Sequence, residues 1–338
     1  MRKNVLYIGN YLRQHNNNPT TMHTMGKLLE QEGYTLHYAS SKKSLLWRLL
    51  DMLWACFKNR KKVDMVLIDT YSTLNFYYAL LISQCCRILK LKYIPILHGG
   101  NLENRLKNNP QLCRLLFSNS YKLVSPSLFL QEVFISYGYE KVDFVPNSIN
   151  IKNYKFQEPQ MLSAAKSLWV RSFSTIYNPS LAVKVLKLLK EEGIEAELCM
   201  VGPDSDGSLQ AVKNLARQLG VSVRFTGKLT KETWVKLAAD YNIFLNTTNF
   251  DNMPVSVIEA MALGLPIVST NVGGMPFLIA SGTDGLLVPP NDEYALAVAV
   301  KQLLHQPVFA KSIAFNARKK AEQFDWELVK EKWFEVLS

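Results

Sequence analysis

The sequence predicts an α/β protein built from two doubly wound domains, each with a parallel sheet between layers of helices. Apolar runs of strand length alternate with helical patterns almost from one end of the chain to the other, which is typical of parallel sheets covered by helices. The 338 residues exceed one average domain, and 48% hydrophobic with 20% charged residues is an ordinary globular composition. A polar stretch over 150–160 interrupts the alternation, so we expect the two domains to meet near it.

The first half of the chain contains six runs of strand length. These runs lie at 5–8, 35–39, 63–68, 92–97, 122–124 and 142–145. Helical patterns between them predict helices at 20–32, 42–58, 72–89, 109–117 and 127–136. Gly33 and Gly138 each follow a predicted helix, at the place where a left-handed residue is favoured.

The second half repeats the same scheme. Strands are predicted at 167–170, 196–201, 221–225, 243–246, 265–269 and 286–288. Helix starts are marked by Asn178-Pro179 and by Asp251 before Pro254. In doubly wound sheets, ligands bind beyond the carboxyl ends of the strands. We therefore expect the functional site in a cleft between two facing sheets, formed by residues that follow strands.

Composition and motifs exclude several classes of protein. No run reaches the roughly 18 to 20 apolar residues that span a bilayer, and the apolar part of the N-terminus is too short for a secretory signal. The five cysteines are odd in number and form no CxxC, so we expect reduced thiols, a cytoplasmic protein and no metal site. No GxGxxG follows the first strand, which argues against a dinucleotide oxidoreductase. We interpret Asp204-Ser205-Asp206 as a turn.

Two carboxylates accompany the helix predicted after strand 243–246. Asp251 lies at the helix mouth, and Glu259 shares one helix face with Asn252 and Ser256, at about 100° per residue. The free N–H groups and positive dipole end of such a helix suit a phosphate. Asp251 and Glu259 could then bind hydroxyls or stabilise a developing cation. The alternative is that Asp251 or Asn252 only caps the helix and that Glu259 is a solvated surface residue.

Residues 251–290 contain several short motifs. They are Glu259-Ala260-Met261-Ala262, Leu263-Gly264-Leu265-Pro266, Val272-Gly273-Gly274 and Gly285-Leu286-Leu287-Val288-Pro289. This segment resembles the donor-binding core of the group 1 (family four) glycosyltransferases, whose GT-B architecture has two facing Rossmann-like domains with a cleft between them. That family has two glutamates separated by seven residues. In this sequence Glu259 is the second, and Asp251 replaces the first.

The resemblance implies a domain plan and roles for this segment. Residues 1–155 would form the acceptor-side domain, residues 156–320 the nucleotide-sugar-binding domain, and 321–338 a helix that crosses back to the first domain. Glu259 would hydrogen-bond the ribose of the donor, and Asp251 would approach the donor sugar. The backbone that would meet the diphosphate comprises Asn252, Met253, Pro254 and Val255. Enzymes of this family generally need no metal ion for catalysis, so none is expected here.

Arg171 lies at the carboxyl end of strand 167–170, where a permanently charged bidentate donor fits a diphosphate leaving group. The family usually has a lysine five or six residues later, where this chain has Ile176 and Tyr177. Lys228, next to Gly227, is either a substitute for that lysine or a surface residue. The alternative role for Arg171 is an interdomain salt bridge.

His98 ends strand 92–97 and precedes Gly99 and Gly100, so it is placed to face the cleft. Alone, such a histidine is more often a packing residue, whereas the resemblance implies that it contacts the donor sugar. Three residues of the loop after the first strand are further candidates for holding the donor or acceptor: Gly9, Thr20 and Thr21.

The first half of the chain is strongly basic. Of the net charge of +11, residues 1–150 carry +10, from 19 Lys and Arg against 9 Asp and Glu. The helix predicted at 42–58 is apolar over a wide arc and is flanked by basic residues, as in helices that lie on membrane surfaces. The residues expected to face an anionic membrane are Lys42, Lys43, Trp47, Arg48, Trp54, Lys58, Arg60, Lys61 and Lys62. The alternative is an internal helix packed on the sheet.

Together with these residues, the resemblance implies a retaining hexosyltransferase. It would transfer a sugar from a UDP- or GDP-type nucleotide-sugar to a glycan or lipid-linked acceptor in surface polysaccharide or lipopolysaccharide biosynthesis. The catalytic candidates are Asp251, His98 and Arg171. We expect no cofactor, no metal and no nucleic acid partner, and a cytoplasmic protein peripheral to the inner face of the membrane. The alternatives are a nucleotide-sugar epimerase or phosphorylase on the same scaffold, and a non-catalytic sugar-binding module.

Overall fold

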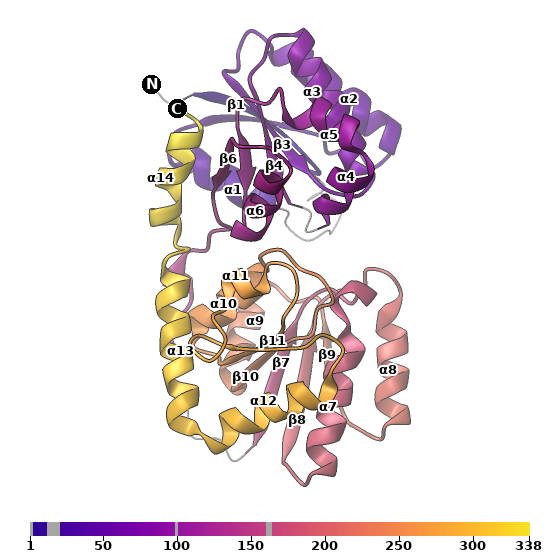
Figure 1. Cartoon of the computed structure of the whole chain (residues 1–338), viewed down its shortest axis with the longest axis vertical. Coiled ribbons are helices and arrows are strands. Elements are labelled where there is room, and N and C mark those ends of the chain that lie inside the picture. Colours follow the sequence, from indigo (N-terminus) through magenta and orange to yellow (C-terminus); the bar gives the residue numbers. More distant parts are fainter. Residues whose placement is uncertain (1–2, 12–20, 99–100, 160–163) are drawn as a thin grey trace. The chain divides into compact units, whose positions relative to one another are not determined.

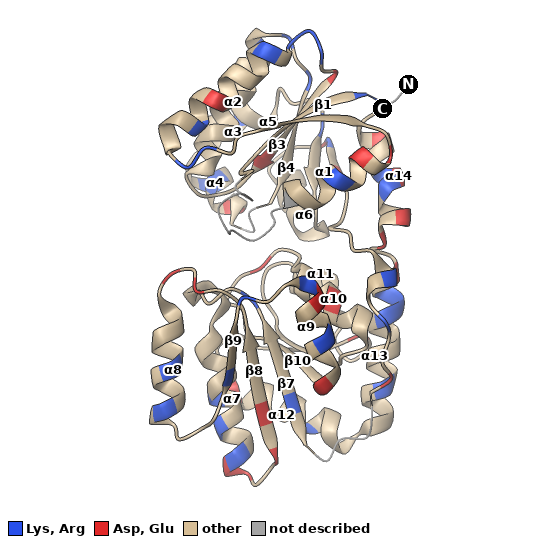
Figure 2. Ribbon diagram, turned by 180° about the vertical axis from the view of Figure 1, so that it is seen from behind, with Lys and Arg blue, Asp and Glu red and all other residues tan. Residues whose placement is uncertain are grey.

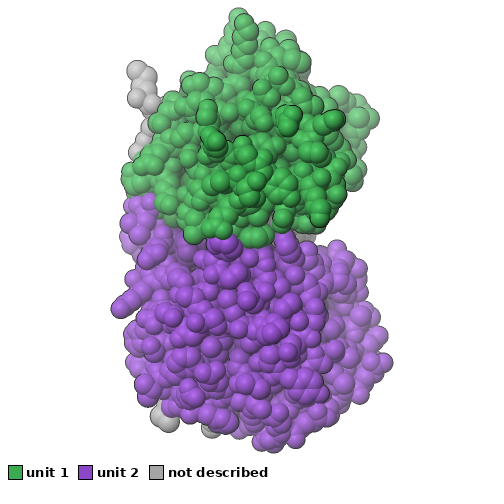
Figure 3. All heavy atoms as spheres, in the orientation of Figure 1, with its two compact units in different colours: residues 1–146, 329–338 green, residues 147–328 purple. Residues whose placement is uncertain are grey.

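The structure is a computed structural model that describes residues 3–11, 21–98, 101–159 and 164–338 (Figure 1). The chain divides into two compact units, Met1–Pro146 with Val329–Ser338 as unit 1 and Asn147–Leu328 as unit 2 (Figure 3). The sequence analysis placed the division after residue 155. In the structure Ile149 and Tyr154 are buried in a core cluster of unit 2, so the segment that contains them packs with the second unit.

Unit 1 contains, among the described residues, a parallel sheet of six strands in the order β2-β1-β3-β4-β5-β6 (Figure 1). The strands are β1 (Asn4–Ile8), β2 (Thr35–Ala39), β3 (Met65–Thr70), β4 (Tyr93–Leu97), β5 (Leu123–Ser125) and β6 (Val142–Phe144). Strands covered on both faces are mostly apolar, as in β3, whose residues are all buried and whose first four, Met65–Ile68, are apolar. The strand order reverses between β1 and β3, because β2 lies on one side of β1 and β3 on the other.

Helices cover the sheet of unit 1. They are α1 (Thr21–Gln31), α2 (Leu45–Asn59), α3 (Asn75–Ile88), α4 (Leu102–Asn108), α5 (Pro110–Phe117) and α6 (Leu128–Ser136). Met52 and Cys56 of α2 and Phe76 and Ile82 of α3 pack with the sheet in one core cluster. The sequence analysis did not predict α4, because only Leu102 and Leu106 of its seven residues are buried and so short a helix has little periodicity.

The buried face of helix α2 includes polar side chains as well as apolar ones. Its buried residues are Arg48, Met52, Cys56 and Asn59. Arg48 Nε donates to the carbonyl oxygen of Lys42 at 2.8 Å, and its Nη2 donates to the next carbonyl along the chain at 3.0 Å. The expectation that Arg48 faces a membrane is therefore wrong, because its guanidinium binds the backbone that precedes the helix. The large apolar side chains of α2 are exposed instead.

Unit 2 contains, within its described residues, a second six-stranded parallel sheet, in the order β12-β11-β10-β7-β8-β9. The strands are β7 (Ala165–Val170), β8 (Ala196–Val201), β9 (Arg224–Gly227), β10 (Ile243–Asn246), β11 (Ile267–Thr270) and β12 (Leu286–Val288). The order reverses between β7 and β10. The strand predicted at 221–225 begins later, at Arg224, because Val221 still bonds to the end of the preceding helix through its N–H.

The helices of unit 2 are α7 (Pro179–Glu191), α8 (Ser208–Gln218), α9 (Lys231–Leu237), α10 (Val255–Leu263), α11 (Met275–Leu278), α12 (Glu293–His305) and α13 (Pro307–Glu322). One core cluster joins α7 and α12 to the sheet, and the other joins α10 and α13 to it. Neighbouring residues of β10, Phe244 and Leu245, belong to different clusters. The two clusters therefore lie on opposite faces of the sheet.

The last helix, α14 (Trp326–Val336), contributes its residues from Val329 onward to unit 1. Lys330 forms an ion pair with Glu32 at 3.3 Å, and the ring of Phe334 stacks on Tyr34 with centroids 6.1 Å apart. The end of the chain thus packs on the first unit. Among the helices that the structure describes, none is both long and apolar enough to cross a membrane.

Candidate active site

The candidate site of unit 2 lies where the strand order of its sheet reverses. Arg171 directly follows β7, and Asp251 lies in the loop between β10 and α10. Because β7 and β10 are neighbouring parallel strands, their carboxyl ends open at the same edge of the sheet. This edge is the usual ligand site of doubly wound sheets.

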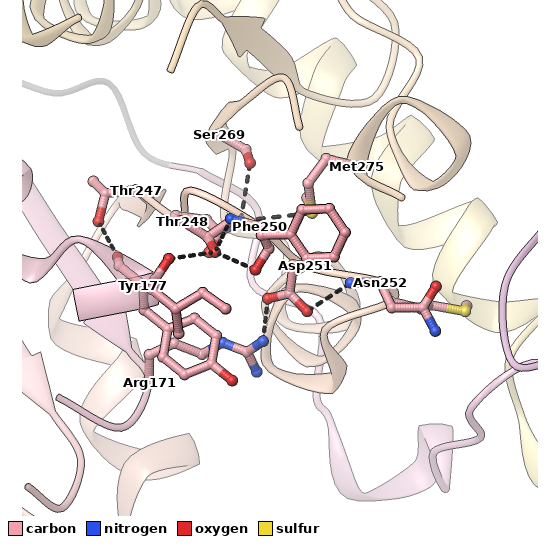
Figure 4. Close-up of polar contacts among 12 residues, drawn as sticks. Arg171, Tyr177, Thr247, Thr248, Phe250, Asp251, Asn252, Ser269 and Met275 are labelled. Carbon is pink, nitrogen blue, oxygen red and sulfur yellow. Dashed lines mark hydrogen bonds and ion pairs between the residues drawn. The ribbon is translucent and has the colours of Figure 1, made fainter. Parts of the chain in front are cut away.

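Arg171 forms an ion pair with Asp251, through one Nη atom and one carboxylate oxygen (Figure 4). The guanidinium lies over the ring of Tyr177, 4.3 Å from its centroid. Burial works to lower the pKa of Arg171, but the charge of Asp251 and the nearby Tyr177 raise it above its ordinary value. The Nε atom of Arg171 is buried and has no hydrogen-bond partner in the described part of the chain. Arg171 is therefore a permanent cation whose Nε donor is unused among the described residues.

The backbone around Arg171 depends on a glycine in the neighbouring strand end. The N–H of Arg171 donates to the carbonyl oxygen of Val201 at 3.0 Å, at the end of β8. A Cβ at Gly202 would lie only 1.7 Å from the carbonyl oxygen of Arg171. The close approach of these two strand ends therefore requires glycine at 202, where φ is +153°.

Asp251 does not cap α10. Its Oδ1 accepts a hydrogen bond from the N–H of Asn252 at 2.9 Å, and its other oxygen faces Arg171. The residue at the N-cap of α10 is Pro254, whose side chain has no oxygen to accept a bond. The interpretation of Asp251 as a capping residue is thus wrong, and the N-cap side chain accepts no bond from the first N–H groups of α10, which are groups that favour an anion.

Glu259 is buried on α10, with 4% of its surface exposed, so the alternative of a solvated residue is wrong. Its Oε1 accepts a hydrogen bond from the hydroxyl of Tyr154 at 2.7 Å. The same oxygen forms an ion pair with Nζ of Lys231 at 2.5 Å. Burial and the charge of Glu259 raise the pKa of Tyr154. Two donors thus hold one carboxylate oxygen of a buried acid.

Lys231 and Tyr154 are site residues that the sequence analysis missed. Tyr154 is separated from Glu259 by 105 residues, and it lies in the polar stretch near which the two domains were expected to meet. Lys231 is the first residue of α9, in the segment that follows β9. The rule that residues after strands line the site would have found Lys231, whereas no local signal indicated Tyr154.

The other predicted residues of unit 2 lie around this centre. Asn252, Met253 and Pro254 are buried in the loop before α10, and Val255 begins that helix. The amide of Asn147 donates to the carbonyl oxygen of Met253 at 2.9 Å. Gly227 ends β9 and accepts a bond from Gly202. Lys228 follows it in the chain.

His98, in unit 1, directly follows β4. Its Nε2 lies 2.8 Å from Oδ1 of Asp69, and 7% of its side chain is exposed. Gly9 follows β1, and Thr21 begins α1. Thr20, Gly99 and Gly100 lie outside the described residues. The structure therefore groups His98 with Asp69, a residue that the sequence analysis did not single out.

The two aspartates of the sequence Asp204-Ser205-Asp206 bind backbone N–H groups of the loops around them. Asp204 accepts from Gly207 at 2.9 Å, and Asp206 accepts from Thr175 at 2.8 Å. The bond from Thr175, with further bonds from Ser208 and Ser174, lowers the pKa of Asp206. This agrees with the interpretation as a turn. Within the described ranges, no group of three or more His, Cys, Asp or Glu side chains is arranged to hold a metal ion.

Comparison with known proteins gives a family match in unit 2. The family model of glycosyl transferases group 1 matches residues 150–320. The chain is 26% identical over 272 residues to the amylovoran biosynthesis glycosyltransferase AmsK of Erwinia amylovora, covering 74% of this chain and 65% of AmsK. It is 25% identical over 296 residues to the N-acetyl-alpha-D-glucosaminyl L-malate synthase of Bacillus anthracis, covering 80% and 75% respectively.

Two solved structures resemble the chain over almost its full length. Sucrose-phosphate synthase from Thermosynechococcus elongatus has a TM-score of 0.81 at 16% identity, covering 99% of this chain and 98% of its own. HepE from Anabaena, solved in complex with UDP and glucose, has a TM-score of 0.80 at 17% identity, covering 99% of both chains. At such low identities the likeness concerns the fold alone.

Proposed function

This chain belongs to the group 1 glycosyltransferases and has their GT-B fold, and from that premise we propose that it is a retaining hexosyltransferase that uses a nucleotide-sugar donor. The observation that carries the proposal is the pairing of Arg171 with Asp251 beside the uncapped start of α10, with Glu259 buried on the same helix. These groups together provide a cation, free N–H donors and two carboxylates at one sheet edge. That set matches a diphosphate, a sugar and a ribose.

In this proposal the donor diphosphate competes with Asp251 for Arg171. Without donor, the carboxylate of Asp251 neutralises the guanidinium. A diphosphate that reaches Arg171 from the start of α10 offers more negative charge and bidentate geometry. Asp251 is then released towards the donor sugar, where its negative charge favours the developing positive charge at the anomeric carbon.

The proposed reaction breaks the bond between the anomeric carbon and the donor phosphate oxygen. The bonding electron pair goes to that oxygen, and Arg171 and the start of α10 stabilise the resulting nucleoside diphosphate. An acceptor hydroxyl then bonds to the anomeric carbon on the same face, so the configuration is retained. Its proton passes to the departing phosphate oxygen. No side chain needs to act as a nucleophile in this scheme.

Glu259 binds the ribose hydroxyls in this proposal, held in place by Tyr154 and Lys231. His98 contacts the donor sugar. The acceptor is a glycan or a lipid-linked sugar, and the name of AmsK, an amylovoran biosynthesis glycosyltransferase, supports a place in polysaccharide synthesis. HepE was solved with UDP and glucose, which supports a nucleotide-sugar donor.

A panel of UDP-, GDP- and ADP-sugars tests the proposal, scored by thermal shift and by release of the nucleotide in the presence of acceptor glycans. We expect one nucleotide class to stabilise the protein and to be turned over. Addition of EDTA should leave turnover unchanged, because Arg171 and α10 supply the positive charge. Conversion of donor without any acceptor into an epimer or a sugar phosphate would instead identify an epimerase or phosphorylase. Binding without turnover would identify a sugar-binding module.

We propose that the exposed side of α2 docks on an anionic membrane, where a lipid-linked acceptor would be found. Six large apolar side chains of this one helix are exposed, with Trp47 at 65% and Trp54 at 60%. They are Leu45, Leu46, Trp47, Leu50, Trp54 and Phe57. Basic residues lie around both ends of the helix (Figure 2): Lys42 and Lys43 precede it, Lys58 lies in its last turn, and Arg60, Lys61 and Lys62 follow it. Exposed tryptophans between basic clusters are typical of helices at a lipid surface.

Sedimentation with vesicles tests this membrane surface. The protein should bind vesicles of phosphatidylglycerol and phosphatidylcholine, bind pure phosphatidylcholine poorly, and dissociate at high salt. The double variant Trp47→Ser, Trp54→Ser should weaken binding at least about tenfold, because it removes two side chains that enter the interface. Tyr294→Ser is the matched control, since Tyr294 is also an exposed aromatic residue but lies on α12 of unit 2. Equal sedimentation of the double variant and the parent would contradict the proposal.

A further inference from the structure

Unit 1 has its own cluster of polar side chains where its strand order reverses. Asp69 is the next-to-last residue of β3, Gly9 follows β1, and His98 follows β4. Strands β1, β3 and β4 are consecutive neighbours in the sheet, so their carboxyl ends lie at one edge. This is the edge at which a doubly wound sheet binds ligands. The mechanism proposed above gives a role to His98 but none to Asp69.

Asp69 is a buried carboxylate with two donors on the same oxygen. Only 1% of its side chain is exposed. Its Oδ1 accepts from the hydroxyl of Tyr7 at 3.0 Å and lies 2.8 Å from Nε2 of His98. Burial and the negative charge of Asp69 raise the pKa of Tyr7 well above its ordinary value, so Tyr7 remains a donor. A buried charge is tolerated only when it is bonded in this way.

The second oxygen of Asp69 explains why a glycine follows β1. Oδ2 is buried and, among the residues that the structure describes, receives no hydrogen bond. A Cβ at Gly9 would lie 2.5 Å from this oxygen and 3.0 Å from Cγ of Asp69. Any side chain at position 9 would therefore displace the carboxylate. Gly9 was expected to admit a ligand, and here it makes room for Asp69.

His98 makes contacts with three neighbouring residues. The ring of Tyr71 stacks on it, with centroids 5.3 Å apart and planes inclined by 26°. The backbone N–H of His98 donates to the carbonyl oxygen of Thr70 at 2.9 Å. Nε2 faces Oδ1 of Asp69, and a carboxylate oxygen can only accept, so this contact favours a hydrogen on Nε2. A neutral imidazole that donates from Nε2 has Nδ1 as its acceptor, so the remaining nitrogen can bind a hydroxyl.

We propose that Asp69 is a positioning residue that acts through His98. It holds the hydrogen of the imidazole on Nε2 and fixes the ring, so that Nδ1 accepts a hydrogen bond from a hydroxyl of the donor sugar. The proposal rests on the proposed function, in which His98 contacts that sugar. Asp69 itself touches no substrate. Gly9 supports the arrangement by leaving space for the carboxylate.

A double-mutant cycle with Asp69→Ala and His98→Ala tests the proposal, with kcat for the preferred donor as the readout. Each single variant should lose about 10- to 100-fold in kcat, the effect of one hydrogen bond that matters in the transition state. The double variant should be no slower than His98→Ala alone, because Asp69 acts only through His98. Asp69→Asn should retain most activity, since its amide oxygen can accept both hydrogen bonds. Multiplicative losses in the double variant would overturn the proposal.

A second measurement separates this proposal from the proposed function. NMR of ¹⁵N-histidine-labelled protein reports the Nε2-bound hydrogen of His98 directly and needs no turnover. We expect that signal in the parent, in Asp69→Asn and in Tyr7→Phe, and its loss in Asp69→Ala. A parent in which the hydrogen lies on Nδ1 would refute the positioning role. If no nucleotide-sugar is turned over but the signal behaves as described, the proposed function fails and the Asp69–His98 arrangement stands.

Two further variants distinguish the positioning role of Asp69 from a purely structural role. Asp64→Ala changes another aspartate next to β3, but at the opposite end of the strand, where it accepts the N–H of Asn4 at 2.8 Å. It should leave kcat unchanged. Gly9→Ala pushes against Oδ2 without removing the carboxylate, and it should lower kcat with no further loss in the His98→Ala background. An additive effect of Gly9→Ala would count against the proposal even if Asp69→Ala fails to fold.

Discussion

Replacing Arg171 with alanine is expected to lower kcat by about 100- to 1,000-fold, the usual effect of removing one pre-organised donor to a developing negative charge. Arg171 is the cation that the structure pairs with Asp251, in the loop that leads to α10. The family's following lysine is replaced here by Ile176 and Tyr177, and Tyr177 stacks on the guanidinium instead of adding charge. The variant also leaves Asp251 without its partner, and this carboxylate then repels the diphosphate. Steady-state kinetics with the preferred donor and acceptor measure both effects.

Variants of Arg171 and Asp251 separate the contribution of charge to kcat from the contribution of hydrogen-bond geometry. Arg171→Lys keeps the positive charge but loses the bidentate fork, so its kcat should lie between those of the parent and the alanine variant. Asp251→Asn frees Arg171, and it should bind the nucleoside diphosphate more tightly while transferring sugar more slowly. Arg217→Ala on the exposed side of α8 is the matched control. A parent-like kcat for Arg171→Ala would show that the diphosphate binds elsewhere.

Replacing Glu259 with alanine is expected to raise the KM for the donor by about 100-fold or more, while kcat changes less. The reason is that Glu259 binds the ribose in the proposed function, and each hydrogen bond to a charged group contributes about 1.5–3 kcal/mol. The free energy of unfolding of this variant should also be lower by about 1–3 kcal/mol, because the buried hydroxyl of Tyr154 loses its acceptor. Donor titrations, followed by kinetics and by denaturant unfolding, check the two parts separately.

Three further variants assign the effect to the carboxylate. Glu259→Gln keeps an acceptor for Tyr154 and should restore stability more than donor affinity. Lys231→Met removes the ion pair with Glu259 and shows how far this lysine contributes to donor binding. Glu232→Ala, at the exposed neighbouring position on α9, should behave like the parent. If Glu259→Ala unfolds more easily but binds the donor as well as the parent does, Glu259 has a structural role only.

The candidate site could be predicted in part. Asp251, Glu259 and Arg171 were found because they follow strands or lie on a helix that begins there, and such positions are visible in local patterns of the sequence. Their mutual arrangement was not visible. An interdomain salt bridge was considered for Arg171, but its partner is Asp251, 80 residues later in the same unit. That pair depends on β7 and β10 being neighbours, which periodicity does not reveal.

Helix α2 illustrates a different limit. Its wide apolar arc and basic flanks were evident from the sequence, and the exposed tryptophans agree with them. Arg48 was nevertheless assigned to the exposed side. Which face of a helix turns inward depends on the groups that it meets, and here the backbone carbonyls of Lys42 and Lys43 bind the guanidinium. A charged residue that finds several acceptors can be buried at little net penalty.

By itself, the amino-acid sequence determined the alternation of strands and helices and the presence of two doubly wound sheets. It also determined most of the candidate functional positions that follow strands. These features arise from side chains within a few residues of one another, so they are recorded in the local order of the chain. Only the tertiary structure decided that Tyr154 and Lys231 hold Glu259, and that Asp69 holds His98. Those contacts join segments 28 to 105 residues apart, and they form because strand order and helix packing bring distant backbone together.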